Sequence, residues 1–213
     1  MSANDLHQGQ PVLHAGASLE QANCAMIMLH GRGATAEDIL TLASEFNRPD
    51  FAYLAPQAAG YQWYPNRFMM PVATNEPYLS SALKLVDDNV NAVVTAGIPK
   101  TKIFLLGFSQ GACLALEYAA RNPQRYGGIA GLSGGLIGDV IPEYSGSMAE
   151  TPMFLGCSDK DIHIPKERVI ESAAVFRGLG ANVTDRLYPN MGHTVNEDEL
   201  EAVRRMIASV SQP

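Results

Sequence analysis

Residues 103–111 constrain the fold most, because an apolar run there ends in a Gly-Phe-Ser-Gln-Gly turn. A G-x-S-x-G turn between a buried strand and a helix is typical of a nucleophile elbow, in which a sharp bend leaves one serine at its tip. A helix-compatible stretch follows at residues 110–120. Gly107 and Gly111 suit such a bend, since a Cβ at either position would meet neighbouring backbone. We therefore predict Ser109 to be a nucleophile.

Short apolar runs alternate along the chain with longer segments of helical period. The runs are predicted as strands over 24–29, 51–55, the stretch before the elbow, 128–132, 153–156 and 182–187. Helices are predicted over 36–46, 76–96, 110–120, 166–179 and the segment that ends near residue 210, with Thr35 as the cap of the first. Apolar strands separated by amphipathic helices indicate an α/β fold: a mostly parallel sheet covered on both faces, in one domain over residues 1–213.

Length and charge exclude several classes of protein. With 213 residues, 46% of them hydrophobic, the chain can bury a full core. Its net charge of -7 argues against a nucleic-acid or anionic-membrane surface, because either needs clustered Lys and Arg. The first residues lack the pattern of a secretion signal, and no apolar stretch approaches the roughly 20 residues of a membrane helix. We therefore expect a cytoplasmic protein with a small-molecule substrate, no membrane span and no nucleic-acid partner.

Cys24, Cys113 and Cys157 lie in apolar stretches without the spacing of a metal site. We expect buried, reduced thiols at these positions rather than a disulfide or a thiolate nucleophile. No metal or other cofactor is predicted.

A serine nucleophile needs a base, and the base needs an acid that holds its tautomer. Both are expected in loops at the carboxyl ends of the strands. His193 follows a predicted strand and precedes the last helix, so we predict it as the base, with His163 as its competitor. His7 and His14 are expected at the surface, and His30 is expected to shape the turn after the first core strand.

Asp159 and Asp161 are the candidates for the acid, because both follow a predicted strand. Asp161, four residues before Pro165, is preferred, and the other carboxylate is expected to serve a turn or a cap. The order Ser109, Asp161, His193 is the order found in α/β-hydrolases.

Acyl transfer also needs an oxyanion hole, because negative charge develops on the carbonyl oxygen. One donor is predicted to be the backbone N–H of Gln110, directly after the nucleophile. The other is predicted to be the backbone N–H of Arg32, in the glycine-rich loop at residues 29–33, for which a generic tight turn is the alternative. The Arg32 side chain is expected to be solvated, with an anionic substrate group as its alternative partner.

Residues 56–75 contain three prolines and one glycine, which exclude a regular element, yet the stretch is rich in aromatic and Met side chains. A long apolar loop at the end of a strand indicates a substrate pocket. We predict its lining to include Leu29, Trp63, Tyr64, Phe68 and Met69. The alternatives are a small satellite core and an exposed apolar face around Trp63 that forms a homodimer. No other segment is long enough for a lid, so open access to the site is expected.

Four motifs together resemble the phospholipase/carboxylesterase family, which includes the acyl-protein thioesterases. They are a strand followed by Leu-His-Gly-x-Gly, the Gly-Phe-Ser-Gln-Gly elbow, the Asp161-x-x-x-Pro165 loop and the Gly192-His193 pair. The match spans nearly the whole chain.

The resemblance implies a small α/β-hydrolase fold without a large lid, and hydrolysis of carboxylic esters or thioesters through an acyl-enzyme. It also implies Ser109, Asp161 and His193 as a catalytic triad, with the Arg32 and Gln110 amides in the oxyanion hole.

The chain departs from the thioesterase pattern at two positions. Ala34 stands where many thioesterases have Asp, and Ile162 stands where many have Pro. Neither departure touches the chemistry, but both weaken a claim to protein depalmitoylation. Two other functions stay open. A serine peptidase or amidase of the same fold would share the triad, and a non-catalytic ligand-binding module would keep the fold without the chemistry.

Overall fold

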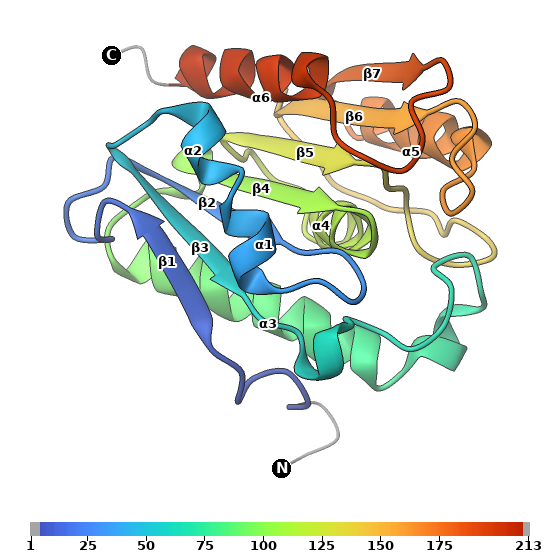
Figure 1. The fold of residues 1–213 in the computed structure, drawn as a ribbon, viewed down its shortest axis with the longest axis horizontal. Coiled ribbons are helices and arrows are strands. Elements are labelled where there is room, and N and C mark those ends of the chain that lie inside the picture. Colours follow the sequence, from blue (N-terminus) through green and yellow to red (C-terminus); the bar gives the residue numbers. More distant parts are fainter. Residues whose placement is uncertain (1–4, 211–213) are drawn as a thin grey trace.

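The computed structural model describes residues 5–210, whose centre is a seven-stranded sheet with helices on both faces (Figure 1). Its strand order is β1-β3-β2-β4-β5-β6-β7; β1 pairs antiparallel with β3, and the other neighbours are parallel. The strands are β1 Val12–Gly16, β2 Cys24–Leu29, β3 Phe51–Pro56, β4 Ile103–Phe108, β5 Gly128–Leu132, β6 Pro152–Ser158 and β7 Asn182–Tyr188. The predicted α/β-hydrolase fold is confirmed.

Two hydrophobic cores lie on the two faces of the sheet, because successive strand residues point to opposite sides. Ala25, Ile27 and Leu29 of β2 belong to the core under α3, α4 and α5, while Met26 and Met28 belong to the core under α1, α2 and α6. The helices are α1 Ala36–Leu40, α2 Ala43–Phe46, α3 Tyr78–Thr95, α4 Gln110–Arg121, α5 Lys166–Gly178 and α6 Glu197–Val210. Short 3₁₀ helices occupy Ala59–Tyr61, Val72–Asn75 and Lys100–Lys102. The first two lie within residues 56–75, so the prediction of no regular element there is wrong, because a single 3₁₀ turn tolerates a nearby proline or glycine.

The helix predicted over residues 36–46 is divided into α1 and α2. Its predicted cap is correct: the Thr35 hydroxyl accepts a hydrogen bond from Asp38 N, and Asp38 accepts one from Thr35 N. The N–H groups of Thr41 and Leu42 then donate three residues back instead of four, at 3.3 and 3.2 Å. This tighter winding interrupts the α-helix, which the spacing of apolar residues does not reveal.

The amino-terminal stretch is part of the fold, so the prediction that His7 lies at the surface is wrong. His7 is fully buried, and its backbone N–H donates to Ser81 Oγ at 3.0 Å. Its ring accepts a hydrogen bond from Ala59 N at Nδ1 and therefore donates from Nε2 to Trp63 O. Burial lowers the pKa of His7, which favours this neutral ring. His14, on β1, is exposed as predicted.

All three cysteines are buried and form no disulfide, as predicted. Burial raises the pKa of Cys113 and of Cys157 to about 12, so both remain neutral thiols at physiological pH. Within residues 5–210, no helix combines the length and the apolar character that crossing a membrane requires.

Candidate active site

Ser109 occupies a strained bend between β4 and α4. Its φ of 55° and ψ of -119° lie in a region that non-glycine residues rarely adopt, and its N–H donates to Leu132 O at 2.9 Å. A Cβ on Gly107 would lie 2.2 Å from Gly111 O, and one on Gly111 would lie 2.1 Å from Leu29 O. Both glycines are therefore required sterically, as the elbow motif predicts.

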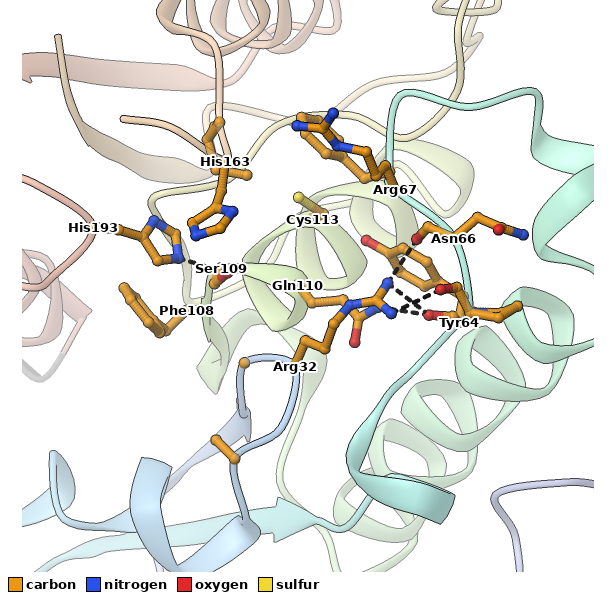
Figure 2. Close-up of a pocket in the computed structure, with 15 residues that line it drawn as sticks. Arg32, Tyr64, Asn66, Arg67, Phe108, Ser109, Gln110, Cys113, His163 and His193 are labelled. Carbon is orange, nitrogen blue, oxygen red and sulfur yellow. Dashed lines mark hydrogen bonds between the residues drawn. The ribbon is translucent and has the colours of Figure 1, made fainter. Parts of the chain in front are cut away.

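The bend presents Ser109 to His193, which follows β7 (Figure 2). Ser109 Oγ lies 2.8 Å from His193 Nε2, and His193 Nδ1 lies 2.6 Å from Asp161 Oδ2. With the Nδ1 proton donated to the carboxylate, the Nε2 lone pair is free to accept the proton of the serine hydroxyl. The three predicted residues thus form one continuous hydrogen-bonded chain.

The Asp161 side chain is fully buried, yet it is well supplied with hydrogen bonds. Its Oδ1 accepts from the backbone N–H groups of His163, at 2.8 Å, and Ile164, at 3.1 Å. Burial acts to raise the pKa of Asp161, but the hydrogen bonds from His193 and from these two amides hold the pKa below its ordinary value. The carboxylate is therefore ionised at neutral pH and oriented toward His193.

The competing residues lie close by but make other contacts. Asp159 Oδ1 accepts from Asn190 N at 2.8 Å, which fastens the loop that leads to His193. The exposed ring of His163 packs edge-on against His193 at 4.8 Å, and Phe108 packs on His193 at 5.0 Å. Asp159 thus has the turn-stabilising contact expected of the second aspartate, and His163 flanks the imidazole.

A cavity of about 610 Å³ opens beside Ser109 (Figure 2). Aromatic and aliphatic side chains form much of its wall, including Tyr64, Phe68, Phe108 and Ile164. The cavity is therefore suited to an apolar group next to the serine.

Of the residues predicted to line the substrate pocket, Tyr64 and Phe68 line this cavity, whereas Leu29, Trp63 and Met69 do not. Leu29 is a fully buried core residue of β2, and Met69 packs against that core. Trp63 is also fully buried, and its indole N–H donates to a backbone carbonyl 2.8 Å away. Because Trp63 anchors the loop in the core, the part of the loop that lines the cavity is residues 64–68. Trp63 itself is therefore not part of an exposed apolar face, although Tyr61 and Met70 of the same loop are exposed.

The loop after β2 comes close to the elbow because Gly111 packs directly on the Leu29 carbonyl. Among the hydrogen bonds of residues 5–210, none starts from the backbone N–H of Arg32 or Gln110. These two N–H groups are therefore available as donors. His30 shapes the turn as predicted: its Nε2 accepts from Ala58 N, and its Nδ1 donates to the adjacent Gly31 carbonyl.

The Arg32 side chain has a role that sequence reasoning missed. Its Nη1 donates to Gln62 Oε1 at 2.9 Å and to Pro65 O at 2.7 Å, and its Nη2 donates to Tyr64 O at 2.9 Å and to Asn66 O at 2.6 Å. The Arg32 side chain is exposed, as expected, but its guanidinium is bonded to residues 62–66 of the chain. Its contact with an anionic substrate group stays a prediction. Three of the four acceptors are backbone carbonyls, which leave no signal in a sequence.

Across the part of the chain that the structure describes, no three His, Cys, Asp or Glu residues are grouped as a metal site requires.

Comparisons with known proteins agree with this geometry. A family model described as Phospholipase/Carboxylesterase matches residues 14–211. The crystal structure of a phospholipase/carboxylesterase from Dyadobacter fermentans is similar with 41% identity and a TM-score of 0.91, over 93% of this chain and 96% of that chain. Acyl-protein thioesterase 1 of Saccharomyces cerevisiae is 28% identical over 92% of this chain and 96% of its own length. Acyl-protein thioesterase 1 of Gibberella zeae is 31% identical, but the alignment covers 56% of this chain and about half, 53%, of that protein.

Proposed function

The chain belongs to the phospholipase/carboxylesterase family, and on this basis we propose that it hydrolyses carboxylic esters or thioesters through an acyl-enzyme on Ser109. The observation that carries the proposal is the hydrogen-bonded chain from Ser109 Oγ through His193 to the buried carboxylate of Asp161. The similarity to thioesterases and carboxylesterases supports the same class of reaction.

In the acylation step, Ser109 Oγ attacks the carbonyl carbon of the ester while His193 Nε2 takes the hydroxyl proton. Asp161 stabilises the imidazolium that results. The oxygen of the tetrahedral intermediate carries the negative charge and accepts hydrogen bonds from the N–H groups of Arg32 and Gln110. Collapse of the intermediate breaks the bond to the leaving alcohol or thiol, which takes its proton from His193.

In the deacylation step, water attacks the acyl-enzyme and gives a proton to His193 Nε2. The carboxylic acid leaves, and the proton returns to Ser109 Oγ. A protonated imidazole cannot accept the serine proton, so turnover should fall at acid pH. Because no step uses a metal ion or another cofactor, turnover should survive a chelator such as EDTA.

The cavity beside Ser109 favours a substrate with an apolar acyl or aromatic group, which Tyr64, Phe68 and Phe108 would contact. We do not extend the proposal to acylated proteins, because the chain departs from the thioesterase pattern at Ala34 and Ile162. Open access further predicts that the rate does not jump at a detergent or lipid interface. We also propose a cytoplasmic location, where three buried cysteines without a disulfide are usual.

The proposal is tested with chromogenic esters from acetyl to decanoyl and with the wild type and Ser109→Ala. We expect the variant to lose turnover, and the chain length with the highest rate to report the size of the acyl site. Full turnover by Ser109→Ala would contradict the acyl-enzyme. A folded wild type that hydrolyses no ester would indicate a ligand-binding module, and amide turnover equal to ester turnover would indicate an amidase.

A further inference from the structure

Arg32 and Gln110, whose backbone N–H groups are the proposed oxyanion donors, also have side chains that bind one segment of the chain, residues 62–66. Arg32 donates to three carbonyls of this segment and to the Gln62 side chain. Gln110 accepts from Trp63 N at 2.9 Å and donates to Tyr64 O at 2.8 Å. The Tyr64 carbonyl thus accepts from both side chains, one from the loop after β2 and the other from the start of α4 (Figure 2).

Residues 62–66 are themselves fixed to the body of the protein. Trp63 is fully buried and donates from its indole to His30 O at 2.8 Å, and Asn66 N donates to the buried Asn75 side chain at 2.8 Å. On the other side of Arg32, Gly33 N donates to Tyr61 O at 2.7 Å. The loop after β2 is therefore bonded to residues 62–66 through His30 and Arg32, and to the adjacent Tyr61 through Gly33.

An oxyanion hole works only if its two donors stay about 2.7–3.1 Å from the same developing oxyanion. Here one donor lies in the loop after β2 and the other at the start of α4, so their spacing depends on contacts between separate elements. An exposed arginine that pairs with one carboxylate adds little to stability. The planar guanidinium of Arg32, with four acceptors, has a geometry that holds a backbone in place.

We propose that residues 62–66 act as a template that sets the spacing of the two oxyanion donors, with the Arg32 and Gln110 side chains as positioning residues. The inference rests on the proposed function, since it concerns the reaction at Ser109. Neither side chain touches the reacting atoms, and each acts through the backbone that it holds.

The template has a consequence for substrate choice, because the same loop supplies Tyr64 and Phe68 to the cavity. An acyl group that packs on these side chains presses on the backbone that positions the donors. Selectivity for acyl chain length should therefore appear mainly in kcat. Removing the Arg32 side chain should flatten the dependence of kcat on chain length.

The test uses Arg32→Ala, Arg32→Lys and Gln110→Ala, each of which keeps its backbone N–H. We expect kcat per titrated active site to fall by about 10²-fold in Arg32→Ala, approaching the loss of a whole oxyanion donor, with KM little changed. Arg32→Lys should recover part of the loss, because an ammonium can reach some of the carbonyls. The double Ala variant should lose less than the product of the single effects, since both side chains act through one segment.

A transition-state analogue separates positioning from simple stabilisation of the fold. A trifluoromethyl ketone forms a tetrahedral oxyanion on the serine, so its affinity should fall by the same factor as kcat/KM in Arg32→Ala. Binding of the product carboxylate should stay unchanged. The matched control is Arg125→Ala, which removes a partly buried arginine that likewise donates to two backbone carbonyls, those of Ala149 and Glu150. Its kinetics should equal those of the wild type.

Wild-type kcat and wild-type affinity for the ketone in both Arg32→Ala and Gln110→Ala would overturn the template. So would a loss in Arg32→Ala that disappears once the rate is divided by the titrated active sites. If Arg32→Ala fails to fold, Arg32→Lys and Gln110→Ala give the same two readouts. Activity retained in Ser109→Ala would instead overturn the proposed function, so the two failures are distinguishable.

Discussion

Replacing Asp161 by Asn changes one atom of the side chain and should remove most of the activity. In the structure, Asp161 Oδ1 accepts two backbone N–H groups, from His163 and Ile164, and Oδ2 accepts from His193 Nδ1. An Asn at this position keeps its oxygen on the two amides, because its NH₂ group cannot accept from them. The NH₂ group then faces His193 Nδ1 and requires that nitrogen to accept.

This exchange reverses the tautomer of His193. With Nδ1 accepting, the ring proton moves to Nε2, which then donates to Ser109 Oγ instead of taking its proton. The same change in a serine protease lowers kcat by about 10⁴-fold, which corresponds to about 5 kcal/mol of transition-state stabilisation. We expect a loss of that order in kcat/KM for Asp161→Asn, with little change in the folded structure.

The assay compares ester hydrolysis by the wild type, Asp161→Asn and Asp159→Asn. Asp159→Asn is the matched control, because its remaining oxygen can still accept from Asn190 N and hold the loop. Its activity should stay close to that of the wild type. A loss in Asp159→Asn as large as that in Asp161→Asn, or near-normal activity in Asp161→Asn, would refute the assignment.

Three further predictions concern stability. Gly111→Ala places a Cβ 2.1 Å from Leu29 O, so it should lower the free energy of unfolding by about 1–3 kcal/mol and abolish ester turnover. Gly178→Ala, which has open space around its Cβ, should change neither quantity. Urea unfolding measures the stability of both variants, and an ester assay measures their turnover. Burial raises the pKa of Glu199 from 4.5 to about 7, so its contribution to stability is full below 4.5 and is lost as the pH rises through about 7. Relative to Glu199→Gln, the wild type should lose up to about 3 kcal/mol of unfolding free energy between pH 5 and pH 8, and equal slopes in urea titrations would contradict this. Because Trp63 is a core residue, Trp63→Ala should lower the free energy of unfolding by about 3–5 kcal/mol and leave the mass of the protein in solution unchanged. A changed mass together with unchanged thermal stability would contradict this prediction.

The sequence predicted those parts of the protein that depend on local chemistry. The apolar runs of the inner strands β2 to β6 are buried on both faces and are therefore continuous, which made them recognisable. The elbow was recognisable because its geometry requires glycine at Gly107 and Gly111. His193 and Asp161 could be predicted because loops at the carboxyl ends of parallel strands meet at one edge of the sheet.

The parts that the sequence did not predict depend on contacts between distant segments. The short edge strand β1, Val12–Gly16, alternates between partly buried and exposed residues and lacks a continuous apolar run. His7 is buried because it finds backbone partners more than 50 residues away, at Ala59 and Trp63. The partners of Arg32 are backbone carbonyls, and no residue type marks them.

The most direct test of the account is the mass of the acyl-enzyme. The wild type is mixed with a chromogenic ester, quenched in acid during the first turnover and digested for mass spectrometry. We expect one acyl group on the peptide that contains Ser109, and no acyl group in Ser109→Ala. An acyl group on a different residue, or turnover by Ser109→Ala, would show that Ser109 is not the nucleophile.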